Sequence, residues 1–202
     1  VPGISGGQGS GYGDYSADIK GSGSNKALTA NGNAGVAVTA SYYGSALSFD
    51  GDNDSLSIPN NSDFNFSDGG DFTIELWLYR KNSGGNDALI GVFENSVARR
   101  AWQLEQRAKQ GLRFEWWSDG TSSSGTLDAP TNAVPTDQWT HICVVRDGNL
   151  ITLYVNGVAA ATDTSAGTFY NNTTDPLRIG VLNAANDADL NGLIQDVRVY
   201  KG

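Results

Sequence analysis

Residues 70–80, GDFTIELWLYR, carry the pattern that decides the fold class of this chain. Side chains alternate between the two faces of an extended chain. The even-numbered residues from Phe72 to Leu78 are all apolar, whereas the odd-numbered ones from Thr73 to Tyr79 include acidic and aromatic side chains. The stretch therefore predicts a β-strand with one face in a core and the other on a half-wetted surface.

Short strands of this kind recur along the chain at intervals of about ten residues. Glycine, of which there are 26, and many Ser, Asn and Asp residues separate them as turns. The run 46–58, ALSFDGDNDSLSI, is expected to form a hairpin around residues 50–54, and Asn156-Gly157 marks a second hairpin turn. No stretch has the caps and sustained spacing of a helix. The sequence predicts an all-β fold, a jelly-roll sandwich of two antiparallel sheets.

Composition divides the chain into two parts. Residues 1–13, VPGISGGQGSGYG, are expected to form a flexible Gly/Ser-rich leader or linker. Residues 14–202 are expected to form a single domain, since sandwiches commonly reach this length as one unit. The only cysteine, Cys143, lies in an apolar run and is expected to be a buried thiol.

The charge balance excludes two classes of partner. The net charge is −9, and the 13 basic residues form no stripe, so the sequence argues against nucleic-acid binding and against an anionic membrane surface. No run is long and apolar enough to predict membrane insertion. Only four of the 22 acidic residues are glutamates. The aspartate excess favours turns and calcium, because Asp bonds its own backbone in loops and offers hard oxygen ligands.

An ordered set of motifs resembles a known family. The set comprises ALSFDG (46–51), GDFTIELWLY (70–79), QWTHICVVRDGNLITLYVNG (138–157), LRIG (177–180) and GLIQDVRVY (192–200). It resembles the laminin-G-like, concanavalin A-like lectin/glucanase superfamily over residues 14–201. The resemblance implies a jelly roll, often with a structural calcium ion, that binds glycans or acts in adhesion. The stretches 14–32 and 42–51 are also similar to such domains in tail and other virion proteins of marine bacteriophages.

A calcium site is expected near the turn at residues 50–54, where several carboxylates lie close in sequence. The family resemblance adds the aspartate of the last motif, so the expected ligands of a structural Ca²⁺ are Asp50, Asp52 and Asp196. The alternative is that these aspartates only shape turns and that Asp196 pairs with Arg198 or Arg178.

A carbohydrate site is expected where exposed aromatic rings adjoin groups that hydrogen-bond sugar hydroxyls. The strands expected at 101–107 and 111–117 put polar and aromatic residues on the face opposite the core, and the loop 183–189 is expected to add ligands at its rim. Trp117 is expected to be essential for binding and dispensable for stability. The expected sugar-binding residues are Trp77, Tyr79, Glu105, Arg107, Arg113, Glu115, Trp117, Asn183 and Asp187. The alternative is that the rings are core residues and the charges pair across strands.

Catalysis is the weakest of the functional interpretations, and no catalytic residue is assigned. The chain lacks the Glu-x-Asp-x-x-Glu strand of glycosidases in this superfamily, although Glu105 and Glu115 could approach each other on neighbouring strands. His141, the only histidine, is expected to be a core or sheet-face residue.

The sequence thus predicts a non-catalytic carbohydrate-recognition or adhesion module, extracellular or on a virion surface. Its expected partner is a glycan or polysaccharide, with self-association or a neighbouring virion or surface protein as further partners. A purely structural decoration or spacer domain is the alternative, and a glycosidase or polysaccharide lyase is third.

Overall fold

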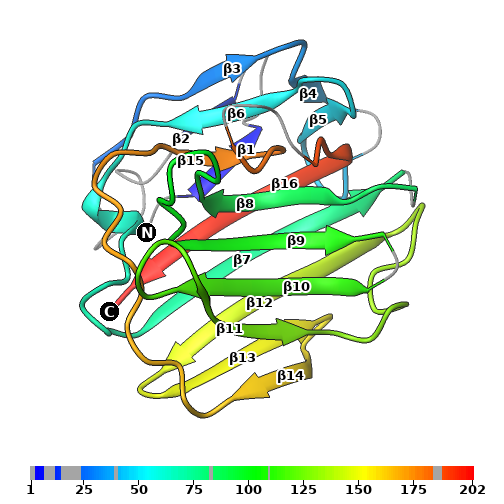
Figure 1. Ribbon diagram of the computed structural model, residues 1–202. Helices are drawn as coiled ribbons and strands as arrows, with labels where there is room; N and C mark the ends of the chain where they lie inside the picture. The colour runs from blue at the N-terminus through cyan, green and yellow to red at the C-terminus, as the bar shows by residue number, and fades with distance from the viewer. Residues whose placement is uncertain are drawn as a thin grey trace.

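Two antiparallel β-sheets pack face to face in a computed structural model of the chain (Figure 1). The structure describes residues 3–6, 12–14, 24–38, 41–81, 84–108, 110–183 and 188–202. Sheet A has nine strands, and its main path runs β14-β13-β12-β7-β16-β1-β2, with β5 on β16 and β4 on β5. Sheet B has seven strands in the order β11-β10-β9-β8-β15-β6-β3. This arrangement confirms the all-β sandwich predicted from the sequence.

The strands are short, as the turn-rich sequence requires. Those of sheet A are β1 (Gly3–Gly6), β2 (Tyr12–Asp14), β4 (Gly35–Ala37), β5 (Ala46–Asp50), β7 (Phe72–Arg80), β12 (Trp139–Asp147), β13 (Leu150–Val155), β14 (Val158–Asp163) and β16 (Asn191–Lys201). Those of sheet B are β3 (Thr29–Asn31), β6 (Ser55–Ile58), β8 (Asp87–Val92), β9 (Trp102–Arg107), β10 (Gly111–Trp117), β11 (Ser123–Asp128) and β15 (Leu177–Ile179). A 3-10 turn, η2, spans Ser62–Phe64. No helix among the described residues is long and apolar enough to cross a membrane.

The core lies between the two sheets and follows the alternation of the strands. Along β7 every even-numbered residue from Phe72 to Arg80 is buried, and every odd-numbered one is half-buried on the outer face. Strands β9 and β10 add Trp102, Leu104 and Phe114 to the same core, each without exposed area. The predicted inward faces of these strands are therefore confirmed. On the outward faces of β9 and β10, Gln103, Glu105 and Trp117 are buried as well.

Strand β7 occupies the middle of sheet A, between β12 and β16. Trp77 lies opposite His141 on β12 and opposite Gln195 on β16. Two residues before Trp77, Glu75 lies opposite Cys143 on β12 and opposite Arg198 on β16. Residues directly opposite each other on antiparallel strands share a face, so these side chains gather on the outer surface of sheet A.

Strand β16 contains an irregularity at its centre. Its register with β7 shifts between Gln195 and Arg198, and Asp196 adopts a positive φ of 53°. The half before the shift pairs with β5, and the half after it pairs with β1. The bulge thus brings two different strands against one edge of β16, and it turns the Asp196 side chain outward beside Arg198.

Residues 46–58 do not form the hairpin that the sequence predicted. The two arms, β5 and β6, belong to different sheets: β5 pairs with β16 and β4, and β6 with β15 and β3. Leu47 and Ile58 are both buried, but they approach the core from opposite sides. The turn between the arms is a corner of the sandwich, held by the Asp54 carboxylate, which accepts hydrogen bonds from the backbone amides of Asp50 (2.9 Å) and Asn33 (2.7 Å).

Two other sequence expectations concern local segments. Asn156 and Gly157 both have positive φ and join β13 to β14, which confirms the second hairpin turn. Within residues 1–13, where a flexible leader was expected, strands β1 and β2 pair with each other and β1 pairs with β16. The rest of that segment lies outside the described residues.

Candidate functional site

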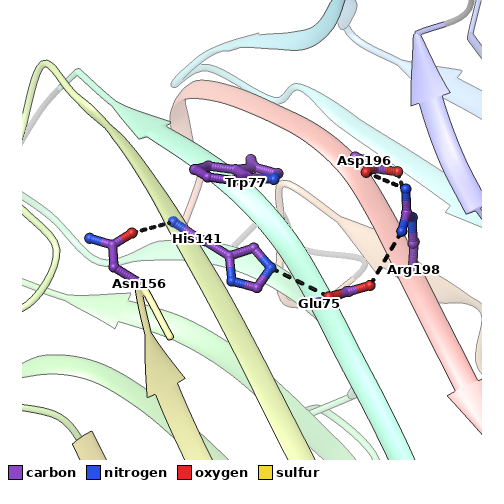
Figure 2. A pocket seen from close by; sticks show the side chains of 6 residues that line it. All are labelled: Glu75, Trp77, His141, Asn156, Asp196 and Arg198. Atoms are coloured by element: carbon purple, nitrogen blue, oxygen red, sulfur yellow. Dashed lines mark hydrogen bonds and ion pairs between the residues drawn. The ribbon is translucent and has the colours of Figure 1, made fainter. Parts of the chain in front are cut away.

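A pocket of about 430 Å³ opens on the outer face of sheet A. It is lined by Glu75, Trp77, His141, Asn156, Asp196 and Arg198, and Figure 2 shows these six side chains. Three neighbouring strands supply most of them, with Glu75 and Trp77 on β7, His141 on β12, and Asp196 and Arg198 on β16. We call this the Trp77 pocket.

Aromatic rings form one wall of the Trp77 pocket. Tyr42 stacks on Trp77, with ring centroids 4.4 Å apart and planes inclined by 15°. The His141 ring lies 5.1 Å from Trp77 on the opposite strand. Tyr42 and Tyr43 are 56% and 48% exposed, so their rings present apolar surface to solvent. Trp77 and His141 thus supply the rings that line the pocket, and Tyr42, stacked on Trp77, extends this aromatic surface beyond the pocket to Trp139 (6.4 Å).

Gln195 holds the two tyrosines in place. Its side chain is buried, and its Oε1 accepts hydrogen bonds from the backbone amides of Tyr42 (3.0 Å) and Tyr43 (3.4 Å). Its Nε2 donates to the carbonyl of Tyr43. Because Gln195 lies directly opposite Trp77 in the sheet, this clamp fixes the Tyr42 ring over the Trp77 ring.

Charged side chains form the other wall as a continuous chain of contacts (Figure 2). Arg198 donates from Nε and Nη2 to the two oxygens of Asp196, at 2.8 and 2.7 Å, and its Nη1 lies 3.6 Å from Glu75. The other Glu75 oxygen lies 3.4 Å from Nε2 of His141. The hydrogen bond with His141, helped by the charge of Arg198, lowers the pKa of Glu75 below its usual range. The hydroxyl of Tyr43 donates to Asp196, and burial together with this carboxylate raises the pKa of Tyr43.

Asn156 closes the pocket from the β13–β14 turn. Its Oδ1 accepts a hydrogen bond from the backbone amide of His141 at 2.9 Å, and its own backbone amide donates to the His141 carbonyl at 2.8 Å. An asparagine amide keeps two further N–H donors on Nδ2. The pocket thus combines rings with hydrogen-bond donors and acceptors that point into one space.

The predicted sugar-binding residues do not gather at one place. Trp77 lines the pocket, and Tyr79 lies on the same outer face of sheet A, 5.7 Å from the Trp139 ring. Four others lie on β9 and β10, on the outer face of sheet B, at the opposite side of the sandwich: Glu105, Arg107, Arg113 and Glu115. One outer face was expected to hold the whole set, and the two-sheet architecture separates it because each sheet has an outer face of its own.

On the outer face of sheet B the charged residues contact one another. Arg113 binds Asp128 through two hydrogen bonds of 2.7 and 2.8 Å, and Arg107 lies 3.3 Å from Glu105. Nε2 of Gln103 lies 3.2 Å from a carboxylate oxygen of Glu105 and another of Glu115. Burial raises the pKa of Glu105, which is 3% exposed. These charges therefore pair with one another, Arg113 with Asp128 across strands and Arg107 with Glu105 within β9.

Trp117 was expected to offer an exposed ring and is instead buried, with 4% of its area exposed. Its ring packs edge-on against Phe93 at 5.2 Å, and its carbonyl accepts a hydrogen bond from the amide of Tyr170 at 2.6 Å. The pairing of β10 with β11 is irregular between Trp116 and Trp117. Residues far away in sequence thus cover a side chain that alternation alone places on the surface.

The predicted loop ligands lie elsewhere again. Asn183 is buried and lines a second pocket of about 370 Å³ on the side of sheet B, together with Ser55, Ser57 and Arg178. Asp187 lies outside the described residues.

The three aspartates expected to bind calcium do not converge. Asp50 pairs with Asn191, which is five positions along β16 from Asp196. At roughly 3.3 Å per residue, this separation corresponds to about 16 Å of strand. Asp50 accepts hydrogen bonds from Asn33 Nδ2 (2.8 Å) and from the amide of Asp52 (2.9 Å), while Asp196 is bound by Arg198. Within the described ranges, no three His, Cys, Asp or Glu side chains are grouped so that they could hold a metal ion. The structure therefore matches the alternative in which these aspartates shape turns and pair with arginine.

Several residues of the Trp77 pocket were not among the predicted site residues. Glu75 and Trp77 both alternate with core residues along β7. The alternation that predicted Trp77 on the outer face therefore also placed Glu75 there. His141 was expected as a core or sheet-face residue, and it lies on the sheet face. Cys143, expected to be buried, is half-buried on this same face, where burial and Glu75 raise its pKa to about 12. Tyr42 carried no periodic signal, because it lies in a turn before β5.

Comparisons with known proteins give the family of this chain. A family model described as the concanavalin A-like lectin/glucanases superfamily matches residues 50–202. Pappalysin-1 from Mus musculus is 26% identical over an alignment of 143 residues that covers 64% of this chain and 9% of pappalysin-1. The chain therefore spans only a small part of that relative.

Similar solved structures include three binding domains or modules. The binding domain of Paraclostridial Mosquitocidal Protein 1 has a TM-score of 0.76 at 17% identity, covering 100% of this chain and 48% of that one. Domain 4 of AbnA, a GH43 extracellular arabinanase from Geobacillus stearothermophilus, in complex with arabinotriose, has a TM-score of 0.63 at 19% identity, covering 94% and 86%. The binding domain of botulinum neurotoxin DC in complex with SialylT has a TM-score of 0.68 at 14% identity, covering 99% and 47%. The chain thus spans about half the length of the toxin binding domains. With the family model matching most of its length, the chain belongs to the concanavalin A-like lectin/glucanases superfamily.

Proposed function

We propose that this chain is a non-catalytic carbohydrate-recognition module and that the Trp77 pocket is its glycan site. The observation that carries the proposal is the stacked pair Tyr42–Trp77 beside the polar groups of Glu75, Asn156, Asp196 and Arg198. Pyranose rings have apolar faces that pack on aromatic rings, while their hydroxyls exchange hydrogen bonds with carboxylates, amides and guanidinium groups. Both kinds of contact are present within one pocket of a size suited to a small ligand.

The comparisons support a binding role. The superfamily description names lectins as well as glucanases, and two of the similar structures are complexes, with arabinotriose and with SialylT. A binding role is also favoured by Glu105, whose buried carboxylate is engaged by Gln103 and Arg107. A glycosidase would need two carboxyl groups poised across a cleft. The two carboxylates of the Trp77 pocket, Glu75 and Asp196, are instead both contacted by Arg198, at 3.6 and 2.7 Å.

A glycan array with the purified protein, followed by titration calorimetry on retained sugars, tests the proposal. Trp77→Ala should weaken binding by about tenfold or more, because a stacking contact worth roughly 1.4 kcal/mol corresponds to that factor. Tyr170→Ala is the matched control, since it removes an aromatic ring near Trp117 and outside the Trp77 pocket. Absence of glycan binding, or equal binding by wild type and Trp77→Ala, would overturn the proposal.

The setting of the module and its calcium ion belong to the same proposal. We place the module outside a cell or on a virion surface, where adhesion or glycan capture takes place. The structural calcium ion stays a prediction without assigned ligands, because Asp50 pairs with Asn191, five positions along β16 from Asp196. A higher melting temperature in millimolar calcium than in EDTA supports the ion, because a ligand that binds only the folded state must raise stability. Equal melting temperatures would remove it.

A further inference from the structure

The charges that line the Trp77 pocket do not balance. Among the described lining residues, Glu75 and Asp196 carry carboxylates, whereas Arg198 supplies one guanidinium. The two carboxylates thus outnumber the one guanidinium among these side chains. The whole chain adds to this excess, since its net charge is −9. A ligand that enters the pocket therefore meets a negative potential.

The single guanidinium is already engaged. Arg198 presents Nε and Nη2 to the two oxygens of Asp196, at 2.8 and 2.7 Å, which is the bidentate geometry that arginine offers a carboxylate. Its remaining nitrogen, Nη1, lies 3.6 Å from Glu75. A ligand carboxylate or sulfate would have to displace Asp196 to obtain the same fork, and it would then lie beside two protein carboxylates.

The same arrangement suits ligands without acidic groups. Carboxylate oxygens accept hydrogen bonds from sugar hydroxyls, and Trp77, which lines the pocket with Tyr42 stacked on it, offers apolar ring surface to a sugar. An ammonium group is favoured further, because a cation is attracted both by carboxylates and by the faces of aromatic rings.

We infer that the Trp77 pocket selects neutral and amino-bearing glycans and excludes glycans whose bound residue carries a carboxylate or sulfate. This inference rests on the proposed function, because it names the ligand class of the same site. It separates this chain from the toxin domain seen with SialylT, to which the chain is only 14% identical.

An array that contains neutral, amino-bearing, sialylated, uronate and sulfated glycans tests the selectivity. Wild type and Trp77→Ala are run in parallel, so that binding through the pocket is identified by its loss in the variant. All Trp77-dependent signals are expected on neutral or amino-bearing glycans. Trp77-dependent binding of sialylated, uronate or sulfated glycans would overturn the inference and leave the proposed function standing. Absence of any Trp77-dependent signal would overturn the proposed function and the inference with it.

A charge variant tests the physical cause. Asp196→Asn removes one carboxylate and frees Nε and Nη2 of Arg198 from their ion pair with it. Asparagine tolerates the positive φ of 53° at this position. The variant is expected to retain acidic glycans about fivefold or more above wild type, because a freed guanidinium binds carboxylates bidentately. Asp147→Asn, at the exposed last residue of β12, is the matched control, since it changes the net charge equally outside the pocket. Melting temperatures of both variants verify folding, and a folded Asp196→Asn protein that gains no acidic glycan would contradict the inference.

Discussion

At the scale of single residues, two tryptophans of similar sequence context have different roles. Trp77 and Trp117 both follow the alternation of a strand and both were expected on the surface. Trp77 remains accessible in the pocket, whereas Trp117 is 4% exposed and packs on Phe93. What covers Trp117 comes from segments distant in sequence, so no pattern within the strand could distinguish the two rings.

Replacement of these tryptophans should therefore affect different properties. Trp117→Ala is expected to lower the free energy of unfolding by about 3–5 kcal/mol, since it leaves a cavity the size of a buried aromatic ring. Trp77→Ala should cost clearly less, because its ring is only partly buried. Urea denaturation of both variants measures the difference. Equal losses of stability, or a Trp117→Ala protein as stable as wild type, would contradict the burial seen here.

Glu105 gives a prediction about pH. Burial raises its pKa, so the folded protein retains a proton at pH values where the unfolded chain has released it. Stability must then fall as pH rises from the ordinary glutamate pKa of about 4.3 through the raised value, and level off above it. Glu105→Gln should not lose stability in this way, because glutamine does not titrate. The melting temperature of Glu105→Gln minus that of wild type should therefore increase from pH 4 towards neutral pH, whereas a constant difference would contradict the raised pKa.

At the scale of elements, the turn before β5 depends on one side chain of β16. Gln195 accepts hydrogen bonds from the backbone amides of Tyr42 and Tyr43. These bonds connect residues that are separated in the sequence by 153 and 152 positions. The alternation of β7 allowed Trp77 to be predicted as a surface aromatic, but the tyrosine that stacks on it could not be predicted. A long-range contact made by an amide leaves no periodic trace in the sequence.

Gln195→Ala should release this turn. Loss of the buried amide leaves backbone groups unpaired and is expected to cost about 1–3 kcal/mol of stability. The amides of Tyr42 and Tyr43 should exchange hydrogen faster, and glycan affinity should fall because Tyr42 is no longer held over Trp77. Tyr42→Ala separates the effects: if the clamp acts through the ring, Gln195→Ala in the Tyr42→Ala background gives no additional loss of affinity. An unchanged exchange rate in Gln195→Ala would contradict the clamp.

Strand pairing sets a similar limit on prediction from sequence. The inward residues of β7, such as Ile74 and Leu76, were identified correctly, because burial follows the alternation within a strand. The sheet to which each strand belongs was not, since a tight Asp- and Gly-rich turn serves a hairpin and a corner equally well. The separation of Asp50 and Asp196 could not be predicted for the same reason, because it depends on the register of β5 against β16.

At the scale of the whole molecule, the sandwich has two outer faces, and alternation within a strand does not say which one a residue occupies. Trp77 and Tyr79 lie on sheet A, while Glu105, Arg113 and Glu115 lie on sheet B, with the core between them. The fold class was predictable, because the number, spacing and ordered motifs of the strands are all local in sequence. The site was predictable only in part, because it requires knowing which strands are neighbours.

This separation predicts which variants alter glycan binding. Arg113 contacts Asp128 across sheet B, so Arg113→Ala breaks an ion pair that is partly exposed and should cost about 0–1 kcal/mol of stability. Its effect on glycan affinity should be within error of zero, since a sugar bound at Trp77 contacts the other side of the molecule. Trp77→Ala in the same titration provides the positive reference. If Arg113→Ala instead weakened binding as much as Trp77→Ala, while its melting temperature stayed near that of wild type, the glycan would have to bind on sheet B, and the Trp77 pocket would need another ligand.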